Sequence, residues 1–109
     1  MNNSTVFFGY ISFLREKVDA AMEIMSKRPG DYLWFCFNPS RVVQDGPGEA
    51  YPNMSFSIIL DTDDEDDIIG DMENIIRQLP FLACTIVVEN RQRDTSRVFR
   101  FDAEESLKL

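Results

Sequence analysis

The stretch from Asp63 to Leu79 constrains the fold of this chain more than any other. Its apolar residues recur every three or four positions, which is the spacing of one face of an α-helix. A helix with one apolar face must bury that face against another element. The stretch therefore predicts an amphipathic helix lying on a sheet, and its apolar stripe consists of Ile68, Ile69, Met72, Ile75, Ile76 and Leu79.

Runs rich in β-branched and aromatic residues surround this helix and predict strands. Another helix is predicted over Leu14 to Arg28, where Pro29 and Gly30 end it. The long run Asn38 to Pro52, with three prolines and two glycines, predicts an extended loop. The predicted strands are Val6 to Phe13, Tyr32 to Phe37, Met54 to Leu60, Phe81 to Glu89 and Arg97 to Phe101.

The order of these elements is β-α-β-β-α-β with one extra strand, which resembles that of ferredoxin-like domains. We therefore expect an α+β fold: an antiparallel sheet with two helices on one face. The extra C-terminal strand forms a hairpin around Asn90 to Asp94. Tyr32 to Phe37 is apolar on both faces, which is typical of a central strand. The length suits a single domain over residues 1–109, with a polar tail at 102–109.

The formal net charge of −8 is concentrated in one part of the chain. Residues 61–82 contain eight acidic side chains and one arginine, a net charge of −7. Residues 1–60 have a net charge of −1, and residues 83–109 have none. A chain with this balance should not bind the phosphate backbone of a nucleic acid directly over most of its surface.

Part of the acidic segment is explained by helix capping. Thr62 and Glu65 have the spacing of a capping box, and acids in a first turn interact favourably with the helix dipole. Further along, Asp67 and Asp71 form a like-charge pair one turn apart, which destabilises a helix slightly. We weigh a plain solvated face against a docking surface for a basic partner. The candidate partner-binding residues are Asp63, Asp66, Asp67, Asp71 and Glu73.

A calcium-binding loop is excluded by its spacing. Such a loop needs glycine at position 6 and glutamate at position 12. Counted from Asp61, these positions are Asp66 and Met72. We expect no bound metal and no cofactor; a carboxylate-dependent metal enzyme remains a third hypothesis, testable by a thermal shift on adding a divalent cation.

Nucleophilic catalysis has little support in this composition. The chain contains no histidine, which excludes a Ser-His or Cys-His pair. Cys36 and Cys84 lie in apolar runs and are predicted to be buried free thiols. Gly46-Pro47-Gly48 lacks the lysine of a phosphate-binding loop. We therefore expect a protein that is not an enzyme.

No run approaches the length of a membrane span, and the first residues lack the charged region of a secretory signal. A cytoplasmic location is therefore expected.

A weaker apolar stripe on the first helix, formed by Phe13, Ala20 and Ile24, leaves a homodimer contact open. Base stacking, as in RNA-recognition modules, is disfavoured because phosphate-binding basic residues are lacking. The aromatic side chains of the first strands are expected to pack in the core: Phe7, Phe8, Tyr10, Tyr32 and Trp34.

In size, acidity and lack of catalytic groups, the chain resembles bacterial immunity proteins and phage-encoded inhibitors. The leading hypothesis is a non-enzymatic cytosolic inhibitor or immunity-type protein that neutralises a basic partner, such as a toxin or nuclease. The alternative is a homo-oligomeric ferredoxin-like module that binds a small ligand between the sheet and the loop at Asn38 to Pro52. Fold resemblance alone assigns neither function.

Overall fold

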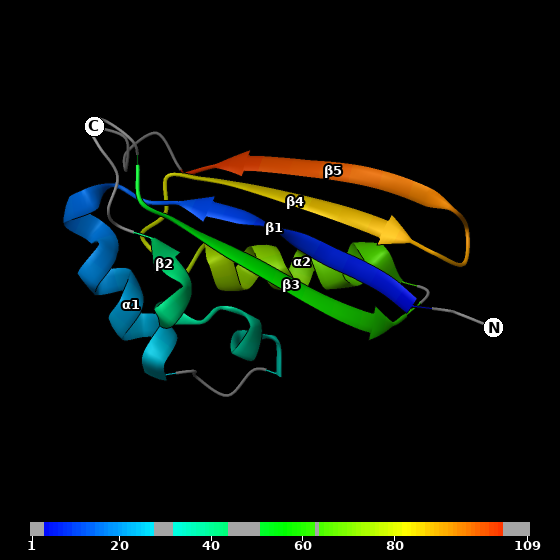
Figure 1. Cartoon of the computed structure of the whole chain (residues 1–109), viewed down its shortest axis with the longest axis horizontal. Helices are drawn as coiled ribbons and strands as arrows, with labels where there is room; N and C mark the ends of the chain where they lie inside the picture. The colour runs from blue at the N-terminus through cyan, green and yellow to red at the C-terminus, as the bar shows by residue number, and fades with distance from the viewer. Residues whose placement is uncertain (1–3, 28–31, 44–50, 63, 104–109) are drawn as a thin grey trace.

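In the computed structural model, which describes residues 4–27, 32–43, 51–62 and 64–103, five strands form one antiparallel sheet. Their order is β2-β3-β1-β4-β5, so β1 lies at the centre (Figure 1). With two α-helices beside this sheet, the expected α+β class is confirmed. The strands are β1 (Ser4–Ser12), β2 (Val42–Val43), β3 (Asn53–Asp61), β4 (Ala83–Asn90) and β5 (Thr95–Asp102).

The central strand β1 alternates between a buried face and a more exposed one, as a strand with one covered face should. Phe7 is fully buried between Ile58 of β3 and Val88 of β4. Gly9 lies on the same side, where a Cβ atom would clash with the carbonyl oxygen of Thr85. Only glycine allows β4 to approach β1 this closely.

Helix α2 (Glu65–Ile76) lies behind the sheet in the view of Figure 1. It is shorter than the predicted helix, and Leu79 is buried beyond its C-terminal end. The prediction that its apolar stripe faces the core is confirmed. The buried side chains of this stripe are Ile68, Ile69, Met72, Ile75 and Ile76.

The predicted capping box is wrong. The N-cap of α2 is Asp64, whose Oδ1 accepts a hydrogen bond of 3.2 Å from the backbone N–H of Asp67. Thr62 lies two residues before the cap, and its hydroxyl accepts a hydrogen bond of 3.1 Å from the N–H of Asp64. Glu65 is buried, and its carboxylate accepts a hydrogen bond from Asn90 of β4. It therefore contacts the sheet and does not cap the first turn of α2.

Helix α1 (Val18–Lys27) follows a 3-10 turn, η1 (Arg15–Lys17), within the predicted helical range. The helical spacing of the sequence predicts one apolar stripe, Leu14, Val18, Ala21, Met22 and Met25. The helix buries Val18, Ala21 and Met25 of this stripe. The helix therefore packs by the face that its periodicity indicates.

The second stripe predicted on α1 does not form an exposed surface. Phe13 is fully buried after the end of β1, and its backbone N–H donates to the carbonyl of Pro52 at 2.9 Å. Ile24 is partly buried and packs against the core. Of the three residues, Ala20 is exposed, and a homodimer contact through this stripe stays a prediction.

The prediction of a central strand at Tyr32 to Phe37 is wrong, because Tyr32–Cys36 forms a 3-10 helix, η2. Its helical spacing lets Leu33, Trp34, Cys36 and Phe37 all enter the core. A strand would direct half of these side chains to the opposite face. A short apolar run without alternation does not distinguish the two conformations. The long loop contains a further 3-10 turn, η3 (Pro39–Arg41), and the edge strand β2; residues 44–50 lie outside the described part.

The predicted hairpin between β4 and β5 is confirmed. Asn90 stabilises its turn, since the Asn90 Oδ1 accepts from the N–H groups of Gln92 and Arg93, both at 3.0 Å. Asp94 adopts a positive φ of 54°, which aspartate tolerates better than most residues. Strand β5 continues to Asp102, one residue into the predicted polar tail, and Ala103 is buried; residues 104–109 lie outside the described part.

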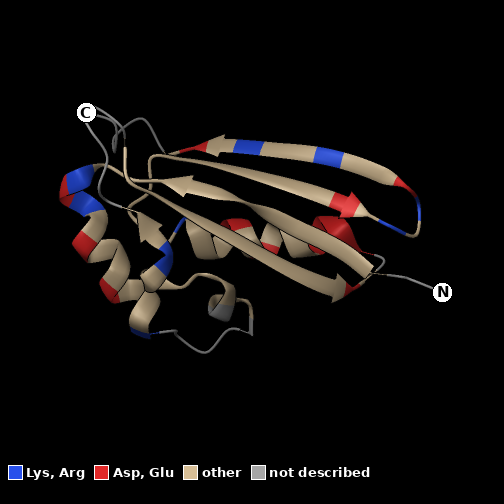
Figure 2. Ribbon diagram, in the orientation of Figure 1, with Lys and Arg blue, Asp and Glu red and all other residues tan. Residues whose placement is uncertain are grey.

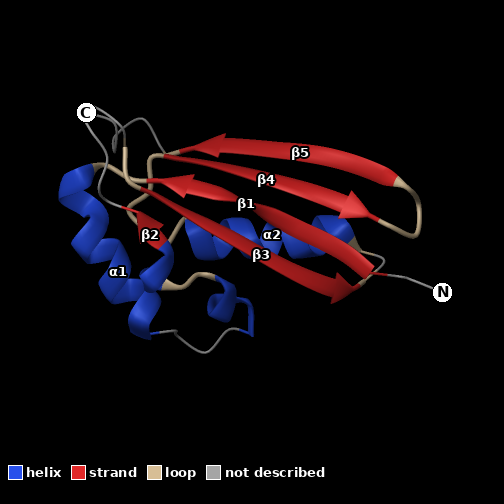
Figure 3. Cartoon of the chain, viewed as in Figure 1, coloured by secondary structure: helices blue, strands red, loops and turns tan. Residues whose placement is uncertain are grey.

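One face of the sheet is free of described helices. Figure 3 looks onto this face, with α2 behind the strands. We call it the open face. Among the described residues, no helix is long and apolar enough to cross a membrane.

Candidate partner-binding surface

Apart from the buried Glu65, the acidic residues of α2 lie on the sides of the helix that its apolar stripe leaves free. We call Asp66, Asp67, Asp71 and Glu73 the acidic ridge. The first three are exposed and Glu73 is half-buried, so the outward orientation expected from the helical period is confirmed. Figure 2 shows the acidic positions along α2 behind the sheet. Asp63, the remaining predicted residue, lies outside the described residues.

Two members of the acidic ridge form ion pairs within the chain. The guanidinium of Arg77 contacts Glu73 through its Nε at 2.8 Å, one helical turn away. Arg97, on β5, reaches Asp66 at 3.0 Å through its Nη1. The charges of Glu73 and Asp66 are therefore offset by arginines of the same chain. Surface ion pairs of this kind contribute little to stability. They offset part of the charge of the acidic ridge, so less of that charge is available to a partner.

Asp67 and Asp71 carry the remaining charge. Neither has an ion pair among the described residues, and both are exposed. The pKa of Asp67 is raised above its usual value, first because its carboxyl group shares a hydrogen bond with Asp64. The negative charges of Asp64 and Asp71 raise the pKa further. This part of α2 therefore concentrates like charges that repel one another.

Glu65 is a residue whose role the sequence interpretation missed. It is 6% exposed, and its Oε2 accepts a hydrogen bond of 2.7 Å from the Nδ2 of Asn90. Its Oε1 has no hydrogen-bond partner among the described residues and lies 3.6 Å from the Nη1 of Arg97. A signal was available: Glu65 stands three and four residues before Ile68 and Ile69, and therefore on the apolar stripe.

Arg97 is the second missed residue. Besides its contacts with Glu65 and Asp66, its guanidinium lies 4.7 Å from the centre of the Phe99 ring. In the sequence it stands close to three other arginines, Arg91, Arg93 and Arg100. Register separates two of them, since Arg97 pairs with buried Val88 on the helix side of the sheet and Arg100 points to the open face. No local signal in the sequence reveals this contact with α2.

Both cysteines are free and buried, as predicted. Burial raises the pKa of Cys36 to about 12 and that of Cys84 to about 12. Each thiol is therefore protonated at neutral pH and is a poor nucleophile. Among the described residues, no three His, Cys, Asp or Glu side chains are grouped so as to hold a metal ion.

A small cavity lies near the beginning of the predicted loop. It has a volume of about 140 Å³ and is lined by Cys36, Asn38, Arg41 and Ser57. Sites for drug-sized ligands usually have volumes of about 300–1,000 Å³. This cavity therefore accommodates only a small molecule or ion.

The aromatic residues considered for base stacking are dispersed. Phe7 and Trp34 are buried, Phe8 is partly buried, and only Tyr10 is largely exposed, at 51%. The side chain of Tyr32 lies outside the described part. Protein-family models, curated proteins and solved structures were each compared with this chain, and none matches it.

Proposed function

We propose that this chain is a non-enzymatic cytoplasmic binding protein of the inhibitor or immunity type, which neutralises a basic protein such as a toxin or nuclease. Asp67 and Asp71 form the centre of its binding surface. The observation that carries this proposal is that these two carboxylates lie one turn apart, exposed and without ion pairs among the described residues.

A basic partner would relieve the repulsion within this surface. Lysine or arginine side chains placed between Asp67 and Asp71 would favour the charged form of Asp67, whose pKa is raised in the free protein. Complementary charge of this kind chiefly accelerates association and selects among partners. The exposed position also implies that binding weakens as ionic strength rises.

We also propose that the fold is ferredoxin-like. The order β2-β3-β1-β4 supports this, with α1 between β1 and β2 in the chain and α2 between β3 and β4. Strand β5 would then be an addition at the β4 edge. Its role would be to hold Arg97 against the start of α2.

The binding proposal is tested by reversing the charges of Asp67 and Asp71 to lysine. The immobilised double variant is compared with the wild type for proteins captured from a lysate of the source cells, using quantitative mass spectrometry. We expect a basic protein that the wild type retains at low salt and releases at high salt to be lost from the variant.

The matched control reverses Glu16 and Asp19, two exposed acids of η1 and α1, and thus changes the net charge equally. This control should capture the same partner as the wild type. Equal capture by the ridge variant, with its fold confirmed by circular dichroism, would show that the surface is wrong.

The small-ligand alternative rests on the cavity beside Arg41 and Ser57. One cation and two polar side chains suit a small anion better than a cofactor, given the volume of about 140 Å³. A screen of small anions by thermal shift tests this alternative, with Arg41→Met as the variant that should lose any response.

A further inference from the structure

The open face presents an apolar patch to solvent. Along β1, side chains alternate with those of Phe7 and Ile11, which enter the core, so the intervening ones point to the opposite side. Strand register brings side chains from four strands together there. We define the open-face patch as Val6, Phe8, Tyr10, Ile59, Val87 and Val98.

Three side chains of this patch are exposed although they are apolar, and the other three, Val6, Phe8 and Val87, are partly buried. Tyr10 is 51% exposed, Ile59 61% and Val98 55%. Phe8 and Val87 are neighbours across β1 and β4, and Val98 pairs with Val87 on β5. Three apolar side chains therefore form a continuous row across the sheet. Contiguous exposed apolar residues of this kind mark interaction sites.

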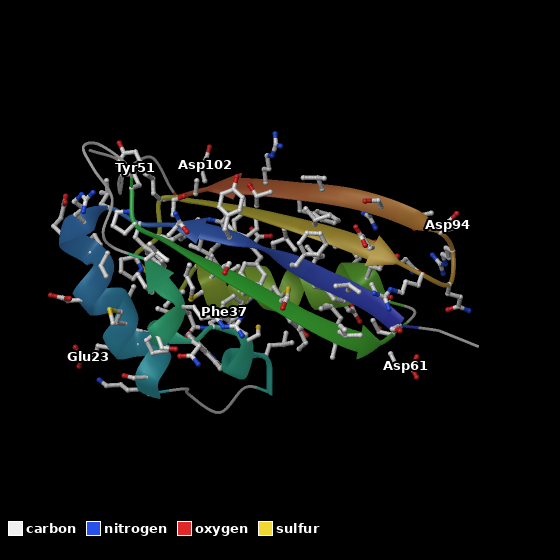
Figure 4. All side chains as sticks on the ribbon, in the orientation of Figure 1. Glu23, Phe37, Tyr51, Asp61, Asp94 and Asp102 are labelled. Carbon is white, nitrogen blue, oxygen red and sulfur yellow. The ribbon has the colours of Figure 1, made fainter. Side chains whose placement is uncertain are left out.

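Charged groups are confined to the margin of the open face. Asp61 lies at one end of β3 and Asp102 at the opposite end of the sheet, as Figure 4 shows. Glu89 lies near the hairpin end of β4 and Arg100 lies on the edge strand β5, while the row through Phe8 carries no charge. An uncharged aromatic centre with a charged rim is the composition of a protein interface. It does not suit a nucleic acid or an anionic membrane, since Arg100 is the single cation that the described strands present on it.

We propose that a second copy of this chain covers the open face, forming a two-fold dimer. The placement of charge favours this occupant. The acidic ridge lies on α2, which covers the other face of the sheet, so face-to-face stacking of the open faces puts the two ridges on the outside of the dimer. Packed sheets ~10 Å apart with a helix ~10 Å wide on each side keep the ridges ~30 Å apart.

At this separation, the repulsion between the two acidic ridges is small, because charges are screened over ~8 Å at physiological ionic strength. The remaining repulsion comes from the rim, where Asp61, Glu89 and Asp102 outnumber Arg100 on each face. The open face is thus a surface through which a chain of net charge −8 can associate with itself. The uncharged centre of the open face offers no carboxylate to a basic partner. The same partner fits the acidic ridge instead.

The area of the face is sufficient for a specific contact. Four strands of about eight residues, at ~4.8 Å between strands and ~3.4 Å per residue, cover a flat area of ~500 Å². Two such faces bury ~1,000 Å² or more, because side chains add relief to the flat area. This reaches the size expected of a specific interface. The dimer would present two acidic ridges in opposite directions, each able to bind one partner.

The test measures the mass of the full chain by sedimentation equilibrium over a concentration series. The wild type should approach twice the 12.6 kDa mass of one chain as its concentration rises. Ile59→Lys and Val98→Lys each place one lysine from either copy, and therefore two charges, in the dimer contact. Each should raise the dissociation constant of the dimer ~100-fold. Asn74→Lys adds the same charge to the exposed outer side of α2 and should leave the dimer intact.

A wild type of 12.6 kDa at every concentration up to the millimolar range would overturn the proposal, and the face would then await a different protein. A dimer that both lysine variants form as readily as the wild type would overturn the choice of face. A measurement on the wild type avoids any dependence on folding of the variants. Access of a soluble paramagnetic probe to the methyl groups of Ile59 and Val98 should fall as concentration rises, and unchanged access would also contradict the dimer.

Discussion

At Glu65 and Gly9, contacts with distant strands limit which side chain the position accepts. The neighbouring residues in the sequence do not reveal these limits. Glu65 is a buried carboxylate that needs Asn90 and the nearby Arg97 to offset the cost of its burial. Gly9 lies where the backbone of β4 leaves no room for a side chain. In both cases the constraint comes from β4 and β5, which follow much later in the chain.

At Gly9, substitution by alanine should destabilise the protein by about 2 kcal/mol or more, because the new Cβ meets the fixed carbonyl of Thr85. Gly70→Ala is the matched control. Gly70 lies on the exposed side of α2 with no atom within 4 Å of the added Cβ. There alanine should stabilise by about 0.5–1 kcal/mol through its helix propensity. Urea unfolding monitored by circular dichroism measures both changes, and a neutral Gly9→Ala would contradict the close approach.

At the scale of elements, β5 is attached to α2 by side chains as well as to β4 by its backbone. Arg97 bridges the two elements through Glu65 and Asp66, and Asn90 joins the start of α2 to the hairpin turn. The N-terminal end of α2 is therefore held by the hairpin. This contact also limits how far the acidic ridge can move relative to the sheet.

Removing this bridge should destabilise the fold. Arg97→Met keeps much of the apolar stem but leaves the buried Glu65 with Asn90 alone, and we expect a loss of about 1–2 kcal/mol. Adding Glu65→Gln to this variant should recover part of the loss, since the amide carries no charge. Arg100→Met, on the open face of the same strand, is the control and should have a smaller effect. Equal losses at both arginines, measured by urea unfolding, would refute the bridge.

The first turn of α2 should make stability depend on pH. The pKa of Asp67 is raised in the folded protein, so folding favours its protonated form. Protonation of Asp67 stabilises the folded state fully below the pKa of about 3.9 that the group has in the unfolded chain. This stabilisation is lost as pH rises through the pKa of Asp67 in the folded state. Asp67→Asn should therefore raise the urea midpoint at pH 7 and have no such effect at pH 3. Asp19→Asn on α1 is the control, and an equal gain there would contradict repulsion centred on Asp67.

At the scale of the whole molecule, the sheet separates two surfaces of different character. The side beyond α2 carries the acidic ridge, with Asp67 and Asp71 unpaired among the described residues. The open face carries the apolar patch around Phe8 and Tyr10. A basic partner and a second copy therefore use different surfaces. Failure of one proposal leaves the other standing, because neither set of variants alters the opposite side.

Periodicity alone was sufficient to predict the helix containing Ile68 and Met72, its outward carboxylates, and the β4–β5 hairpin. These features depend on residues close together in the chain, where side-chain spacing and turn chemistry decide the conformation. The burial of Cys36 and Cys84 was predictable for the same reason, since each lies within an apolar run.

Tertiary structure alone decided the remaining features. Leu33 and Phe37 enter the core from a 3-10 helix because contacts with distant strands select among conformations that a short apolar run allows. Arg97 reaches the acidic ridge because the register of β5 turns it toward α2, across 31 positions of sequence. Local sequence determines which face of an element is apolar. Long-range packing determines which charges remain without partners, and therefore where this protein can bind another.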